Sequence, residues 1–101
     1  MIEFKTVEDK MICIPKIDIV ASNVPEMRDQ MLKHLDKKEW NSLVLDCSNV
    51  DALDSVGVNL IVGLFKKADS AGKSFVVSNC NEPLTKVLKL FRLDEKFAIE
   101  S

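Results

Sequence analysis

Residues 43–57 read Leu-Val-Leu-Asp-Cys-Ser-Asn-Val-Asp-Ala-Leu-Asp-Ser-Val-Gly, and they contain the transition that decides the fold. The apolar run at 43–45 has no polar alternation, which is typical of a central strand covered on both faces. A polar loop follows, and a helical pattern begins at Ser55 directly after Asp54. The N–H groups at the start of a helix are unpaired and favour negative charge, so a hydroxyl there is well suited to carry a phosphate.

The flanking sequence predicts the other elements of a single domain over residues 1–101. Residues 2–7 alternate between apolar and polar side chains, and residues 11–14 form an apolar run after a polar turn. This pattern indicates a hairpin whose second strand lies near an edge at Pro15. Helices are predicted from the N-cap Asn23 to 37–39, from 54–55 to about 71, and after 81–83. Strands are predicted at 75–77 and, as a short closing strand, at 97–99. The expected inner faces of the first and third helices comprise Met27, Met31, Leu32, Leu35, Leu84, Val87, Leu88 and Phe91.

The resulting order, β-β-α-β-α-β-α with a closing strand, predicts an α/β fold. We expect a mixed sheet of four to five strands packed by three or more helices.

Composition narrows the classes of function. The chain has 101 residues, of which 47% are hydrophobic and 30% charged, with a net charge of −2. The hydrophobic content is sufficient for a folded core, and the slightly negative net charge does not indicate the basic patch of a nucleic-acid-binding protein. No apolar run approaches the roughly 20 residues that cross a bilayer, and the start of the chain does not resemble a signal peptide. We therefore expect a cytoplasmic protein without direct nucleic-acid or membrane contacts, and a monomer because no long apolar edge demands a partner.

Residues that could support enzyme chemistry are few. His34, the one histidine, is expected to be a solvated surface residue with no nucleophile beside it. Neither a G-x-x-x-x-G-K-[ST] loop nor a G-x-G-x-x-G turn is present. The three cysteines, Cys13, Cys47 and Cys80, lack the spacing of a zinc site or a disulfide framework, and small buried thiols are expected. Cys47 and Cys80 both follow predicted strands, so they could lie near each other at one sheet edge.

Carboxylates leave a second hypothesis open. Asp18, Asp46, Asp51 and Asp54 could converge where parallel strands end, and there hold magnesium or an aspartyl phosphate. The alternative is that Asp46 and Asp51 simply cap and turn the loop after the strand. Ser55 has a structural alternative too, because serine often caps helices.

The segment 43–58 resembles the STAS domain of bacterial anti-sigma factor antagonists, whose pattern is approximately L-D-L-S-x-V-x-x-[MI]-D-S-[STA]-G-L. The likeness extends to 17–18, 24–28, 63–68 and 71–73, and weakly to 87–93, and so covers nearly the whole chain. It implies that Ser55 is phosphorylated by an anti-sigma factor that is itself a serine kinase. The unphosphorylated protein would bind that kinase and release its sigma factor. Phosphorylation would switch this binding off until a PP2C-type serine phosphatase removes the phosphate.

The same resemblance implies that Asp18 and Asp54 orient Ser55 and contribute, with Val56 and Gly57, to a partner-facing surface. It implies no catalytic residue, metal or cofactor.

Several positions depart from the family pattern. Val56 replaces a common second hydroxyl, Val58-Asn59 replaces a frequent Leu-Gly, Pro15 stands at a frequent glycine, and the usual terminal helix is missing. These differences leave partner identity and part of the binding surface open. The alternative functions are a STAS scaffold or adaptor subunit in a signalling or transport complex, with Ser55 unmodified, and a small hydrolase or phosphotransferase using Asp46 and Asp54.

Overall fold

Strands and helices alternate along the chain in the predicted order. The computed structural model describes residues 1–101. Its elements are β1 (Ile2–Val7), β2 (Lys10–Pro15), α1 (Val24–Lys37), β3 (Ser42–Asp46), α2 (Ser55–Ser70), β4 (Ser74–Ser78), α3 (Glu82–Leu90), the 3-10 turn η1 (Leu93–Glu95) and β5 (Ala98–Ile99). The predicted hairpin, three helices and short closing strand are thus confirmed, with boundaries that move by one or two residues.

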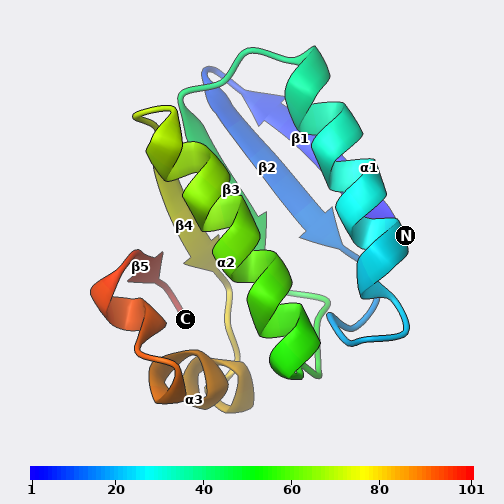
Figure 1. Ribbon diagram of the computed structural model, residues 1–101, viewed down its shortest axis with the longest axis vertical. Helices are drawn as coiled ribbons and strands as arrows, with labels where there is room; N and C mark the ends of the chain where they lie inside the picture. Colours follow the sequence, from blue (N-terminus) through cyan, green and yellow to red (C-terminus); the bar gives the residue numbers. More distant parts are fainter.

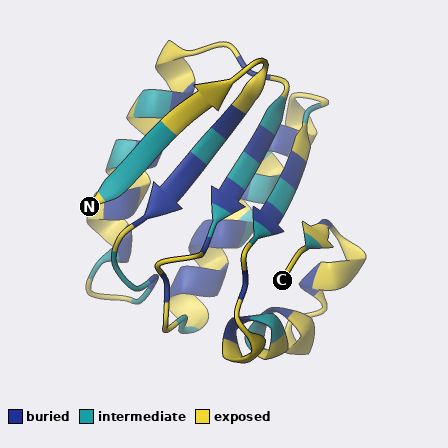
Figure 2. Ribbon diagram, turned by 180° about the vertical axis from the view of Figure 1, so that it is seen from behind, coloured by how far each residue is buried: buried dark blue, intermediate teal, exposed yellow.

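The order of the strands in the sheet, β1-β2-β3-β4-β5, is the order in the chain. β1 pairs with β2 antiparallel, and every later pair is parallel. Because successive crossovers are right-handed and advance in one direction, they bring their helices to the same face. Accordingly α1 and α2 cover one face of the sheet, whereas no helix covers the other (Figures 1 and 2).

The expectation that the strand at 43–45 is covered on both faces is therefore wrong. Leu43 and Leu45 are buried beneath the helices, but Val44 points to the uncovered face and is only half-buried. An uninterrupted apolar run indicates a central strand without telling on which side the crossovers lie.

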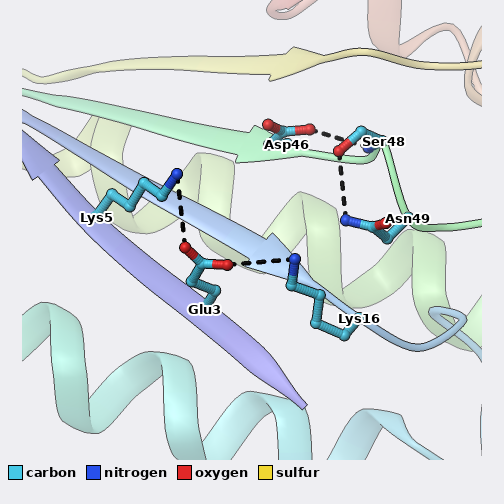
Figure 3. Close-up of polar contacts among 6 residues, drawn as sticks. All are labelled: Glu3, Lys5, Lys16, Asp46, Ser48 and Asn49. Carbon is cyan, nitrogen blue, oxygen red and sulfur yellow. Dashed lines mark hydrogen bonds and ion pairs between the residues drawn. The ribbon is translucent and has the colours of Figure 1, made fainter.

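The uncovered face has an apolar row with polar borders. In register across the strands, Ile12, Val44, Val76 and Ala98 lie side by side. Beside this row Glu3 forms ion pairs with Lys5 (3.5 Å) and Lys16 (3.2 Å), as Figure 3 shows. This face is thus polar at its margin and apolar along its middle.

The core lies between the sheet and the two helices and extends to α3, which sits beyond the carboxyl ends of the strands (Figure 1). It comprises 24 buried residues. Phe75 and Phe97 meet edge to face, with ring centroids 4.9 Å apart, and Phe65 lies 5.4 Å from Phe97. These contacts attach the short strand β5 and the turn before it to the main core.

Three residues differ from their predicted positions. Leu32 is 37% exposed because the inner stripe of α1 passes through Val24, Met27, Met31 and Leu35 and leaves Leu32 at its border. Phe91 is 51% exposed because α3 ends at Leu90, so the helical period no longer applies to it. His34 is half-buried rather than solvated, and its ring stacks on Phe4 with centroids 4.0 Å apart.

No helix of the structure has the length and apolar character needed to cross a membrane.

Candidate functional site

Two loops at the carboxyl ends of β2 and β3 run side by side and hold the start of α2. Ile19 and Leu53 form a parallel bridge beyond the named strands. The Ile19 N–H donates to the Ala52 carbonyl (3.1 Å), and the Asp54 N–H donates to the Ile19 carbonyl (3.4 Å). The two loops thus continue the β2–β3 pairing up to Asp54, directly before the first residue of the helix.

Asp18 ties these loops together with its side chain. One carboxylate oxygen accepts from the N–H groups of Asp51 (2.9 Å) and Ala52 (3.1 Å). An ionised acceptor makes such hydrogen bonds roughly twice as strong as neutral ones. Asp18 therefore sets the path of the β3–α2 loop just before it reaches Asp54.

Asp54 is the N-cap of α2 and bonds to two different segments. Its Oδ1 accepts from the Gly57 N–H (2.8 Å), which is the capping bond, and its Oδ2 accepts from the Ala21 N–H (2.9 Å) in the β2–α1 loop. The Ala21 and Gly57 N–H groups lower the pKa of the Asp54 carboxyl because they stabilise its charged form. Asp54 is thus an ionised tie between helix and loop.

Ser55 and Val56 are the first two residues of α2, and both face solvent. Ser55 is exposed, and 38% of Val56 is exposed. The carboxylates of Asp18 and Asp54 bond to backbone N–H groups and not to the Ser55 hydroxyl. They hold the segments that present Ser55, which leaves the hydroxyl accessible.

Gly57 is buried because a backbone segment passes directly over it. A Cβ atom at this position would overlap the Ile19 carbonyl oxygen and lie 2.8 Å from Leu53 Cδ1. Glycine is a poor helix former, so its place in the first turn of a helix is a sequence signal of close approach. The Ile19 carbonyl over Gly57 and the Ala21 N–H that bonds to Asp54 carry no recognisable sequence signal, because any residue provides such backbone groups.

The carboxylates Asp46 and Asp51 do not join this site as metal ligands. No three His, Cys, Asp or Glu side chains are grouped so that they could hold a metal ion. Asp46 instead accepts from the Ser48 N–H (2.9 Å) and the Asn79 side-chain amide (3.0 Å), and Figure 3 shows its contact with Ser48. Partial burial raises the pKa of Asp46, but the Asn79 and Ser48 bonds outweigh it and leave that pKa lowered. The loop-turning alternative is thus confirmed for Asp46.

A groove between α1 and α2 begins one helical turn beyond Ser55. It measures about 210 Å³ and is lined by Arg28, Leu32, Asn59, Leu60, Gly63 and Leu64. Ser55, Asn59 and Gly63 are spaced by four residues, so they follow one face of α2. The exposed serine and the groove are therefore continuous parts of one surface.

Known proteins with similar sequences and structures share this architecture. A Thermotoga neapolitana protein, provisionally named an anti-sigma factor antagonist and TM1081 homolog, is 29% identical over 94 residues, which are 93% of this chain and 83% of that protein. The crystal structure of the TM1081 protein of Thermotoga maritima, also provisionally named an anti-sigma factor antagonist, has a TM-score of 0.92 at 27% identity and covers 99% of this chain and 86% of that one.

The phosphorylated form of the Bacillus cell fate determinant SpoIIAA has a TM-score of 0.73 at 12% identity, over 100% of this chain and 91% of that one, which shows a common fold alone. The family model described as the STAS domain matches residues 1–101, and the chain belongs to the STAS domain family.

Proposed function

We propose that this protein is an anti-sigma factor antagonist whose binding to a serine-kinase anti-sigma factor is switched off by phosphorylation of Ser55. The observation that carries the proposal is the exposed hydroxyl of Ser55 at the first position of α2, beside the capping carboxylate of Asp54. Relatives provisionally named anti-sigma factor antagonists support the general role. On this proposal residues 1–101 act in the cytoplasm as one binding module without catalysis of their own.

Phosphorylation of Ser55 would alter the charge of the site more than its shape. A phosphate adds roughly −1.5 to −2 charge at pH 7. The start of the helix favours that charge by about 0.3–1 kcal/mol, whereas the neighbouring Asp54 carboxylate repels it and already accepts the Gly57 N–H. Because these effects oppose each other, we expect the fold to change little.

The partner interface responds differently to the same charge. Burying an unpaired charge against a partner is unfavourable by several kcal/mol, and each 1.4 kcal/mol reduces affinity tenfold. The switch therefore needs no rearrangement of the protein. Removal of the phosphate by a PP2C-type serine phosphatase would restore binding, and an exposed position at the tip of the helix suits both enzymes.

The partner-facing surface that we propose combines Ser55 and Val56 with the groove between α1 and α2. Val56, next to Ser55, and Leu32, in the lining of the groove, are both more than one third exposed and provide apolar contact area. Gly63 faces open space, where a Cβ atom would have no neighbour within 4 Å. The packing of the fold therefore does not require a glycine here, and the small residue instead keeps the groove open.

The test is incubation with ATP, magnesium and each kinase-type anti-sigma factor of the same organism, followed by intact-mass and peptide mass spectrometry. We expect a single phosphate on Ser55 from one of these kinases. The Ser55→Ala variant should remain unmodified. Ser48→Ala is the matched control, since Ser48 is an exposed serine in the preceding loop. This variant should still acquire the phosphate on Ser55.

Binding completes the test. Ser55→Asp should bind the same kinase at least tenfold more weakly than wild type, while Ser48→Asp, which adds the same charge nearby, should bind like wild type. If no kinase modifies Ser55 but binding persists and is unaffected by Ser55→Asp, the switch is excluded. The chain would then be a constitutive STAS scaffold or adaptor.

A further inference from the structure

Arg28 is the only charged residue that lines the groove between α1 and α2. It is exposed and belongs to none of the four ion pairs of the protein. One turn after Leu32, by contrast, Asp36 joins α1 to Lys67 of α2 through an ion pair of 3.0 Å. The charges beyond that end of the groove therefore neutralise each other, whereas Arg28 carries a positive charge without a partner.

The size and lining of the groove suit a protein side chain better than a small molecule. Its volume of about 210 Å³ is below the roughly 300–1,000 Å³ of small-molecule pockets. Its apolar lining consists of the buried Leu60 and Leu64 and the partly exposed Leu32. The open space at Gly63, where a Cβ atom would have no neighbour within 4 Å, admits an apolar side chain from outside. A partner helix can therefore pack here as the ridges of one helix pack into the grooves of another.

The guanidinium of Arg28 indicates what accompanies that apolar side chain. A guanidinium forms bidentate hydrogen bonds with planar anions, and carboxylates are the anions that an unmodified protein partner supplies. Phosphate sites gather several cations or backbone donors, but no second cation lines this groove. A helix bound in a groove presents anchors three or four residues apart, which matches the one-turn spacing of Arg28 and Leu32 along α1.

We propose that this groove receives a helix of the anti-sigma factor, which inserts an apolar side chain over Gly63 and pairs a carboxylate, one turn away, with Arg28. The inference rests on the proposed function, because it specifies the element of the same partner that meets α1 and α2. Ser55 follows the same face of α2 as Gly63, so a phosphate on it would add negative charge to a surface that a carboxylate approaches. Like charges brought together oppose association, and the acidic residue of the partner thus contributes to rejection of the phosphoprotein.

The experiment measures, by calorimetric titration, binding of the full chain to the kinase that phosphorylates Ser55. Arg28→Glu should weaken binding by roughly tenfold or more, because it places a negative charge against the partner's carboxylate. Lys33→Glu is the matched control, since Lys33 is an exposed cation of α1 that does not line the groove, and this variant should bind like wild type. Gly63→Leu fills the open space and should also weaken binding by roughly tenfold or more. Thermal melts of all three variants check that they are folded.

A charge exchange identifies the carboxylate of the partner. Each exposed Asp or Glu of the kinase is replaced by Lys and titrated with Arg28→Glu, and one of these replacements should restore most of the lost affinity. Equal losses for Arg28→Glu and Lys33→Glu, unchanged binding of Arg28→Glu or Gly63→Leu, or a loss that no charge exchange restores would each overturn the inference. All of these outcomes leave the phosphorylation of Ser55 intact, whereas absence of that phosphate in the mass-spectrometric assay contradicts the proposed function itself.

Discussion

Helices α2 and α3 begin at the same edge of the sheet with matching caps, but their first turns are built for different purposes. Asp54 caps α2 through the Gly57 N–H at 2.8 Å, and Asn81 caps α3 through the Leu84 N–H at 2.9 Å. In both cases the bonded residue is the third of the helix. In α3 this residue is a buried leucine, whereas in α2 it is a glycine beneath the Ile19 carbonyl.

The two helices also differ in the residue at their first position. α3 begins with Glu82, which already complements the helix dipole, whereas α2 begins with Ser55, whose charge can be changed. The cap of α2 is ionised and bonds to a second loop through Ala21, whereas the cap of α3 is neutral. The first turn of α3 is thus anchored by a side chain buried in the core. The first turn of α2 is instead held by contacts between backbone groups, and its outer surface remains exposed to solvent.

The largest effect is expected from Gly57→Ala. The added methyl group would overlap backbone that cannot move without breaking the loop pairing, so the free energy of unfolding should fall by about 3 kcal/mol or more. Urea titration measures this loss. Gly63→Ala, in the same helix but facing open space, should instead raise the free energy of unfolding by up to about 1 kcal/mol. Equal stability of the two variants would contradict the close approach of Ile19.

The next largest difference in stability is expected between variants of the two N-cap residues. Asn81→Ala removes a cap and should lower the free energy of unfolding by about 1 kcal/mol. Asp54→Ala should lower it further, because the Ala21 N–H loses its acceptor together with the Gly57 N–H. Thermal melts of both variants, measured side by side at pH 7, make the comparison. A smaller loss for Asp54→Ala would show that the second loop is not held by this carboxylate.

The α2 cap should also depend on pH, which the α3 cap cannot do. The pKa of Asp54 is lowered in the folded state, so its ionised form stabilises the fold above the unfolded-state pKa, about 4, and that contribution disappears as pH falls through the folded pKa. The stability advantage of wild type over Asp54→Asn should therefore be full at neutral pH and shrink below about pH 4. Asn81→Asp offers the reciprocal check, since it introduces a titrating cap at α3. An advantage that stayed constant down to pH 2 would refute the ionised tie.

No phosphorylation is expected when the serine is moved from the first position of α2 to the first position of α3. Glu82→Ser in a Ser55→Ala background places an exposed serine at the first position of α3, behind a cap of nearly identical geometry. On the proposed function the kinase recognises the surface around α2, so this variant should acquire no phosphate in the mass-spectrometric assay. Modification of residue 82 would mean that any capped helix start is sufficient.

Much of this architecture could be predicted from local sequence. The alternation at 2–7, the polar turn and Pro15 indicate the opening hairpin, and Asn81 with Pro83 marks the start of α3, because these signals act within a few residues. Gly72, with a φ of 71°, lies just after the end of α2, where a glycine in this conformation commonly terminates a helix. Ser55 at the start of α2 was predicted on the same local grounds.

What could not be predicted depends on contacts distant in the chain. Asn23 lies at the N-cap position of α1 but does not cap it, because its amide donates to the Asp18 carbonyl instead (2.9 Å). Stacking of His34 on Phe4 requires the placement of α1 over β1. The uncovered position of Val44 follows from the spatial order of all five strands, which no window around residue 44 contains.

The bridge between Ile19 and Leu53 has a consequence for the speed of the proposed switch. Because paired backbone already orders both loops, a partner would meet a surface that requires no folding before contact, and little conformational entropy would be lost on association. Amide hydrogens at Ile19 and Asp54, both engaged across the bridge, should accordingly exchange with solvent slowly. Encounter would then be limited by diffusion and orientation, and the lifetime of each signalling state by the kinase and phosphatase alone.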